Sequence, residues 1–137
     1  MTHELLGVDQ KDQKVLVLPQ GLEIVGSNWF EGSFMEKLFI PSSVRKLGHE
    51  AFAFCKSLRE VVFEPGSRLE CIGYRSFAHC GLTEIVIPRS VETIETSAFC
   101  YCASLTSVRF EEGSRLASVQ LGAFYNTMLE RDDIKFP

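Results

Sequence analysis

Five cysteines and three histidines are the side chains in this sequence with the most specific chemistry. Both residue types bind zinc, and structural zinc sites usually draw on closely spaced pairs of such ligands. Cys100 and Cys102 are separated by one residue, which is the wrong spacing for a zinc-binding pair, and no second C-x-x-C or histidine pair accompanies them. The sequence therefore predicts no metal ion and no cofactor.

The histidines are also candidates for acid–base catalysis, in which they would activate a neighbouring nucleophile. His3, His49 and His79 occupy unrelated positions in the repeat described below, so stacking of the repeats would not bring two of them together. No serine lies in a G-x-S-x-G turn. Acidic pairs such as Glu92 and Glu95 show no sign of the burial that catalytic carboxylates need. The sequence therefore predicts a protein that is not an enzyme.

Three of the cysteines belong to a ladder of small side chains. Cys55, Cys80 and Cys102 each come three residues after a phenylalanine, and the equivalent positions of other repeats hold Ser33 and Thr127. A small, weakly polar residue at one repeat position indicates a packing requirement, which a free cysteine meets as a small buried hydrophobe. A disulfide between Cys55 and Cys80 is the alternative, although disulfide frameworks are typical of small secreted chains with paired cysteines.

The phenylalanines set the period of the whole chain. They are separated by 22, 25, 22 and 25 residues, and each is preceded by an aliphatic residue five positions earlier and another three positions before that. The repeat phenylalanines are Phe30, Phe52, Phe77, Phe99 and Phe124. A fixed period between 20 and 50 residues indicates stacked units, each of which buries its apolar face against its neighbours. We therefore expect a solenoid with the five rings in one buried stack.

Each repeat is expected to open with a short strand and to continue into turns. The unit 85–107 begins with the run Ile85–Ile87, which ends at Pro88 because proline cannot donate a ladder hydrogen bond. A short helical or 3-10 turn at 97–99 would then bury Phe99. The sequence thus predicts one strand and one buried aromatic ring per unit.

Two longer loops explain why the spacing alternates. Residues 64–68 read Glu-Pro-Gly-Ser-Arg and residues 111–115 read Glu-Glu-Gly-Ser-Arg, and the two loops are 47 residues apart, as are Pro41 and Pro88. We expect the loop glycines to be turn residues that allow positive φ, because a phosphate-binding loop would continue into Lys-Ser or Lys-Thr at a helix start.

The repeat can be written I-x-I-P-x-S-V-x-x-I-x-x-x-A-F-x-x-C-x-S-L-x-x-V. Residues 85–108 carry this pattern almost completely, and residues 39–61 match its Pro-Ser-Ser-Val, Ala-Phe and Cys-x-Ser-Leu portions. The variant Phe-Glu-x-Gly-Ser-Arg-Leu stands at 63–69 and 110–116. In these features the chain resembles the BspA-like (Treponema-type) leucine-rich repeat family over residues 16–137. It departs from the family pattern at Trp29, where alanine is usual.

The resemblance implies an α/β repeat solenoid, a right-handed curved superhelix of about five coils. The parallel β-sheet would lie on the concave face, with short helical or 3-10 turns on the convex face. The expected coils are 15–37, 38–60, 61–84, 85–107 and 108–133, with the start of a sixth at 134–137 and a polar N-terminal cap at 1–14. Similar proteins are surface antigens that bind host extracellular proteins such as fibronectin and fibrinogen, which implies a surface antigen or adhesin segment with an extracellular-matrix protein as its partner.

Composition restricts the partners and leaves two compartments open. The net charge of −4 and the pI near 5.4 argue against a nucleic-acid binder, and no apolar run is long enough to span a membrane. Residues 1–14 lack the basic start and apolar stretch of a signal peptide, which favours the cytoplasm. The resemblance favours the cell surface instead.

The middle residue of each opening strand should point away from the core, because side chains alternate along a strand. Successive coils place Val17, Phe39, Val62 and Val86 there, followed by Arg109, and two positions earlier stand Lys37, Glu60 and Glu84. An apolar stripe about 15–20 Å long that is rimmed by charge is typical of a protein-binding surface. The alternative is that β-branched residues simply suit strands. The sequence thus favours a non-enzymatic protein-binding module, with an intracellular scaffold or self-assembling repeat protein as the alternative.

The C-terminal coil offers a second candidate surface. Residues 134–137 fit the start of a sixth coil, and a terminal coil without a polar cap leaves part of its core uncovered. We expect this end to associate with another molecule, most simply as a two-fold homodimer. The residues expected at or near that contact are Phe124, Tyr125, Met128 and Leu129.

Overall fold

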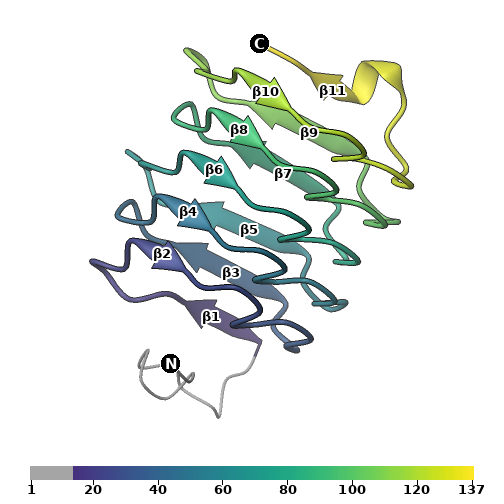
Figure 1. Ribbon diagram of the computed structural model, residues 1–137. Helices are drawn as coiled ribbons and strands as arrows, with labels where there is room; N and C mark the ends of the chain where they lie inside the picture. Colours follow the sequence, from purple (N-terminus) through teal and green to yellow (C-terminus); the bar gives the residue numbers. More distant parts are fainter. Residues whose placement is uncertain (1–13) are drawn as a thin grey trace.

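The computed structural model describes residues 14–137, and the predicted N-terminal cap therefore lies almost wholly outside the described residues. The chain winds into stacked coils, each of which contributes two short strands that run parallel to those of the next coil (Figure 1). This arrangement confirms the predicted parallel-strand solenoid of about five coils.

One strand of each coil is the predicted opening strand. The opening strands are β1 (Val15–Val17), β3 (Lys37–Ile40), β5 (Glu60–Phe63), β7 (Glu84–Ile87), β9 (Ser107–Phe110) and β11 (Ile134–Lys135). They form two parallel sheets, β1-β3-β5 and β7-β9-β11. Equivalent residues are paired in register, so that Phe39 lies between Val17 and Val62, and Val86 lies beside Arg109.

A second strand in each coil was not predicted from the sequence. These strands are β2 (Ile24–Val25), β4 (Lys46–Leu47), β6 (Cys71–Ile72), β8 (Thr93–Ile94) and β10 (Ser118–Val119), and they form one five-stranded parallel sheet. Each ends on the aliphatic residue that precedes the repeat phenylalanine by five positions. Two residues are too few to show the alternation by which strands are recognised in a sequence.

The segments that carry the phenylalanines are turns with positive-φ residues such as Ser97, so the predicted short helical or 3-10 turns at these positions were wrong. In the second coil the residues two positions before and after Phe52, Glu50 and Phe54, both adopt positive φ. The main-chain N–H groups of these three residues donate to carbonyls of the next coil at 2.8 Å. The turns are therefore linked from coil to coil as regularly as strands are. Among the described residues, the 3-10 helix η2 (Arg131–Asp133) is the regular helix of the structure.

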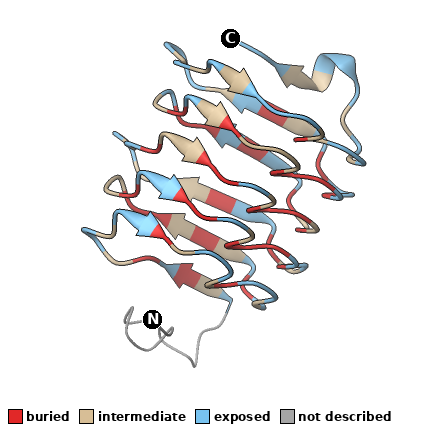
Figure 2. Ribbon diagram, in the orientation of Figure 1, coloured by how far each residue is buried: buried red, intermediate tan, exposed pale blue. Residues whose placement is uncertain are grey.

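The core is a continuous stack of aromatic rings between the two layers of strands. The centroids of successive rings from Phe30 to Phe124 are 5.4 Å apart and the rings are nearly parallel. The first four rings are at most 1% exposed, which confirms the predicted stack. Buried residues, drawn in red, recur from coil to coil along the ribbon (Figure 2). Phe124 is half-buried and its ring is stacked on that of Phe99.

Candidate protein-binding surface

The outward side of the opening strands is named here the opening-strand face, and it carries the apolar stripe that the sequence predicts. Val17 and Val86 are 58% and 41% exposed, whereas Phe39 and Val62 are half-buried. Arg109 is exposed in the next coil. Since the inward neighbours of these residues lie in the core, the alternation expected for the strands is present along this face.

Charged residues hold the side chains at the centre of this face. The Nζ atom of Lys37 lies 3.3 Å from the Glu60 carboxylate and 4.9 Å from the ring centre of Phe39. Lys37 and Glu60 are directly paired between β3 and β5. Lys37 therefore covers one side of the Phe39 ring. Because both charges are partly exposed, the ion pair with Glu60 fixes the position of the lysine side chain more than it stabilises the fold.

An apolar hollow of about 360 Å³ lies beside the stripe, where the opening strands end. Phe39 and Val62 contribute to its wall, and Pro41 and Pro65 close it on the side of the turns. Prolines end strands here because they have no N–H for the ladder. The proline turn of one coil and the longer loop of the next coil thus place a rigid, apolar rim next to the stripe.

The ladder of opening strands is interrupted between β5 and β7, which belong to different sheets. A second hollow of about 260 Å³ lies there, with Val62 and Val86 among its lining residues and Glu60, Glu84 and Glu111 also along it. The interruption coincides with a connection between cysteine and strand that is one residue shorter in this coil than in the coils before and after it. The face therefore contains an apolar hollow and a neighbouring acidic one.

Glu64 lines both hollows. Its carboxylate accepts hydrogen bonds from the Ser42 main-chain N–H at 2.9 Å and from Gln20 Nε2 at 3.0 Å. The hydrogen bond from Ser42, followed by that from Gln20, lowers the pKa of Glu64 below its ordinary value. Glu64 is thus a fixed negative charge at the boundary of the two hollows. The sequence pattern indicated only a turn at this position, and its one available signal was the repetition of Glu at the equivalent Glu111.

The predicted self-association residues lie together on the last coil. Tyr125 and Met128 are each 61% exposed, and Phe124 and Leu129 are half-buried. Leu121, which the sequence pattern did not single out, is 86% exposed in the same coil. The C-terminal coil therefore presents a second apolar surface, separate from the opening-strand face.

The histidines take part in aromatic contacts. The ring of His79 is stacked between Phe54 and Tyr101 at centroid distances of 4.4 and 4.7 Å, and His49 packs edge-on against Tyr74. His3 lies outside the described residues. Over residues 14–137, His, Cys, Asp and Glu side chains form no group of three that could hold a metal ion. Nor does that part of the chain contain a helix long and apolar enough to cross a membrane.

The five cysteines are free thiols. Cys55, Cys80 and Cys102 each donate a hydrogen bond to the carbonyl of the repeat phenylalanine in the preceding coil, at 3.0–3.2 Å. This contact explains why the ladder position takes small side chains with a donor. The alternative of a Cys55–Cys80 disulfide is not what the structure contains.

Comparison with protein families gives a match over residues 16–137, to six copies of the BspA type leucine-rich repeat region. A comparison with curated proteins gives no match. Proteins with this repeat are typically binding modules for other proteins and surface antigens, not enzymes.

Solved structures with the same fold come from several bacteria. The pneumococcal vaccine antigen PcpA is 23% identical, with a TM-score of 0.78 over 93% of this chain and 42% of its own. A leucine-rich repeat protein of T. pallidum is 30% identical, with a TM-score of 0.64 over 80% of this chain and 59% of its own. One from Bacteroides capillosus is 27% identical, with a TM-score of 0.63 over 72% of this chain and 77% of its own.

The present chain spans less than half of the length of PcpA and about three fifths of that of the T. pallidum protein. The repeat pattern, the stacked coils and the family match all cover the same residues. The chain belongs to the BspA type leucine-rich repeat family.

Proposed function

We propose that the domain binds another protein through its opening-strand face, with Phe39 and Val62 at the centre of the contact. The observation that carries this proposal is the position of the 360 Å³ apolar hollow beside the acidic hollow, with Val62 and Glu64 lining both. Apolar clusters with a charged rim are the usual centres of protein interfaces. A partner would bury an apolar side chain in the first hollow.

The charges next to this hollow define the partner's second requirement. Glu84 and Glu111 line the acidic hollow, and neither makes an ion pair among the described residues, whereas Glu60 is paired with Lys37. A lysine or arginine a few residues from the apolar anchor would complement them. The partner segment is therefore one in which an apolar residue and a basic residue are close neighbours.

The same proposal places the domain at the cell surface, where host extracellular proteins such as fibronectin and fibrinogen are candidate partners. The description of PcpA as a vaccine antigen supports this location. Antibody labelling of intact cells that produce the full-length protein tests it. Labelling only after the cells are permeabilised would contradict it.

Differential capture tests the binding face. The immobilised wild-type domain is compared, in serum and extracellular-matrix extract, with the variant Phe39→Ala/Val62→Ser. The matched control is Phe34→Ala/Val119→Ser, which changes two exposed apolar residues outside both hollows. We expect at least one protein to be retained by the wild type and the control and lost by the face variant.

The wild-type domain and the two variants should melt at similar temperatures, since none of the four substituted residues belongs to the buried core. Capture of the same proteins by all three domains, or of none by the wild type, would contradict the proposal.

A second candidate function is self-association through the C-terminal coil. The observation that favours it is the group of exposed apolar side chains there, with Leu121 86% and Met128 61% exposed. Two copies of this surface would cover each other about a two-fold axis. Light scattering at about 0.1 mM should then give a dimer that Met128→Glu converts to a monomer. A wild-type monomer at that concentration would refute the contact.

A further inference from the structure

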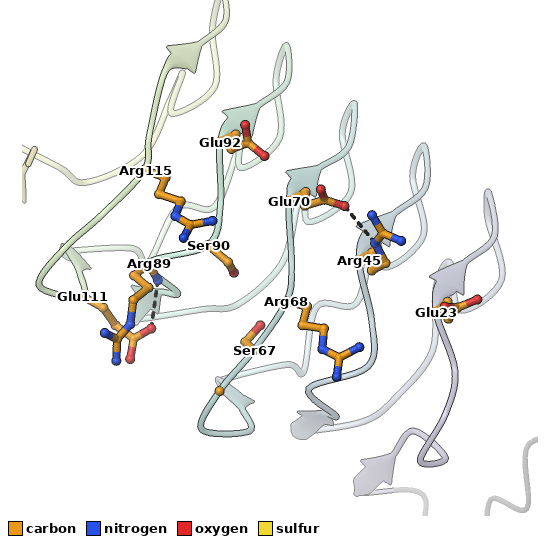
Figure 3. A pocket seen from close by; sticks show the side chains of 11 residues that line it. Glu23, Arg45, Ser67, Arg68, Glu70, Arg89, Ser90, Glu92, Glu111 and Arg115 are labelled. Carbon is orange, nitrogen blue, oxygen red and sulfur yellow. Dashed lines mark hydrogen bonds and ion pairs between the residues drawn. The ribbon is translucent and has the colours of Figure 1, made fainter.

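A charged depression of about 450 Å³ lies over the turns that lead into the second strands. It includes none of the apolar residues proposed to bind protein, and it shares Glu111 with the acidic hollow. Four arginines and four glutamates line it, together with Ser67, Ser90 and Gly66 (Figure 3). The lining arginines are Arg45, Arg68, Arg89 and Arg115, and the lining glutamates are Glu23, Glu70, Glu92 and Glu111. The repeated Gly-Ser-Arg loops, whose glycines have φ near +80°, bring Arg68 and Arg115 to it.

Three of the four guanidinium groups have no acidic partner. Arg45 is paired with Glu70, with its Nε atom 3.0 Å from the carboxylate. Arg68, Arg89 and Arg115 make no ion pair within residues 14–137, and they come from three successive coils. The Glu111 carboxylate accepts a hydrogen bond from the main-chain N–H of Arg89 at 2.9 Å, not from its side chain. The depression is therefore lined by three guanidinium groups that have no acidic partner among residues 14–137.

A buried hydroxyl in the same depression also has no partner. The Oγ atom of Ser90 is shielded from solvent and makes no hydrogen bond to any described residue. Ser43 follows Pro41 as Ser90 follows Pro88, and its hydroxyl accepts a hydrogen bond from the Gly21 N–H of the preceding coil at 3.1 Å. Ser90 cannot do the same, because the N–H of Arg68 donates to the Ser42 carbonyl. The depression thus has a polar atom whose hydrogen-bonding capacity is left for a ligand.

Figure 3 shows the hydroxyls of Ser67 and Ser90 between the guanidinium groups of Arg68 and Arg115. Arginine forks with adjacent hydroxyl donors match the oxygens of a tetrahedral anion, which can accept several charge-assisted hydrogen bonds at once. The glutamates around the depression would repel a densely charged polymer. They tolerate one compact anion that is surrounded by neutral or basic groups.

We propose that this depression binds a single phosphate or sulfate group, held by Arg68 and Arg115 with Arg89 and the Ser90 hydroxyl. The mode of binding differs from that of a glycine-rich phosphate loop, in which main-chain N–H groups at a helix start hold the anion. Here side chains from three coils hold it, so the site exists only when the coils are stacked. The site is separate from the apolar hollow at Phe39 and Val62, and Glu111 is the residue that it shares with the acidic hollow.

NMR titration of the amide signals of the domain tests the proposal, with inorganic phosphate, inorganic sulfate and a sulfated polysaccharide as separate probes. Phosphate or sulfate should shift the signals of residues 66–68, 89–90 and 113–115 in a saturable way. Arg68→Gln and Arg115→Gln should each weaken binding about tenfold, and Ser90→Ala by a smaller factor. Arg131→Gln, which removes one positive charge in the 3-10 helix, is the matched control and should leave the affinity unchanged.

Three results would overturn the proposal. The first is that neither ion shifts these signals at concentrations up to about 20 mM, above which binding would have little specificity. The second is that the arginine variants and the control bind the ions equally, which would reduce the effect to net charge. The third is that the polysaccharide binds while the single ions do not, which would make the depression a polyanion surface. A preference for phosphate over sulfate, or the reverse, identifies the source of the anion and supports the site in either case.

Discussion

Single residues link each coil to the next by side-chain hydrogen bonds to the main chain. Cys102 donates to the Phe77 carbonyl, as the cysteines of the two preceding coils do to theirs. At the repeat position that holds Gly48 and Gly73 in earlier coils, Glu95 and Gln120 accept hydrogen bonds from the main-chain N–H groups of Tyr74 and Thr96. Residues that look like departures in the sequence thus replace a close main-chain approach with a side-chain contact.

The buried thiols make stability depend on alkaline pH. Burial raises the pKa of Cys102 to about 12, from the ordinary value of 9.0 that the unfolded chain keeps. Below pH 9 the thiol is protonated in both states and has no effect. As the pH rises from 9 towards 12 only the unfolded chain loses the proton, so the free energy of unfolding should fall by about 1.4 kcal/mol per pH unit for this thiol.

Urea unfolding of the wild type and of Cys102→Ser between pH 7 and pH 11 measures this effect. Serine keeps a donor for the Phe77 carbonyl and does not ionise in that range, so the stability of the wild type relative to the variant should decline above pH 9. A constant difference between the two proteins would show that the thiol is not buried as described.

The elements of each coil are short, and they are ordered by stacking rather than by their own length. Two-residue strands such as β4 and β6 have no stability of their own, and each pairs with both neighbours in a ladder of five. The opening strands could be predicted because each is a short β-branched run in which inward-facing and outward-facing side chains alternate. The second strands and the interruption between β5 and β7 could not, because pairing between coils is not visible within one segment.

The ring stack makes the contribution of a phenylalanine depend on its place in the array. Phe77 is fully buried between the rings of Phe52 and Phe99, whereas Phe124 has a ring neighbour on one side and is half-buried. Phe77→Ala should lower the free energy of unfolding by about 3–5 kcal/mol, and Phe124→Ala by clearly less.

Ser76→Ala is the matched control for this measurement by denaturant unfolding. Ser76 is as buried as Phe77 and adjacent to it, its hydroxyl has no hydrogen-bond partner among the described residues, and the equivalent positions hold Ala51 and Ala98. The change should not destabilise the domain. A loss below about 1 kcal/mol for Phe77→Ala would mean that the stack contributes little.

The whole molecule is an array in which every coil depends on its neighbours, and its surfaces follow from that geometry. The sequence period predicted the array, and the alternation of the opening strands predicted the stripe from Val17 to Val86. The two hollows and the charged depression could not be predicted, since they depend on side chains from loops of different coils. Glu64 and Ser90 are examples, because what matters is which atoms of the next coil each one contacts.

The central claim is that the opening-strand face, and not the C-terminal coil, contacts the protein partner that the domain captures. Hydroxyl-radical footprinting of the wild-type domain, free and in complex with a captured partner, tests it directly. We predict that oxidation of Phe39 falls severalfold in the complex while oxidation of Tyr101, Tyr125 and Met128 stays as it is in the free domain. Unchanged oxidation of Phe39 together with protection of Tyr125 and Met128 would contradict the claim and assign binding to the C-terminal coil.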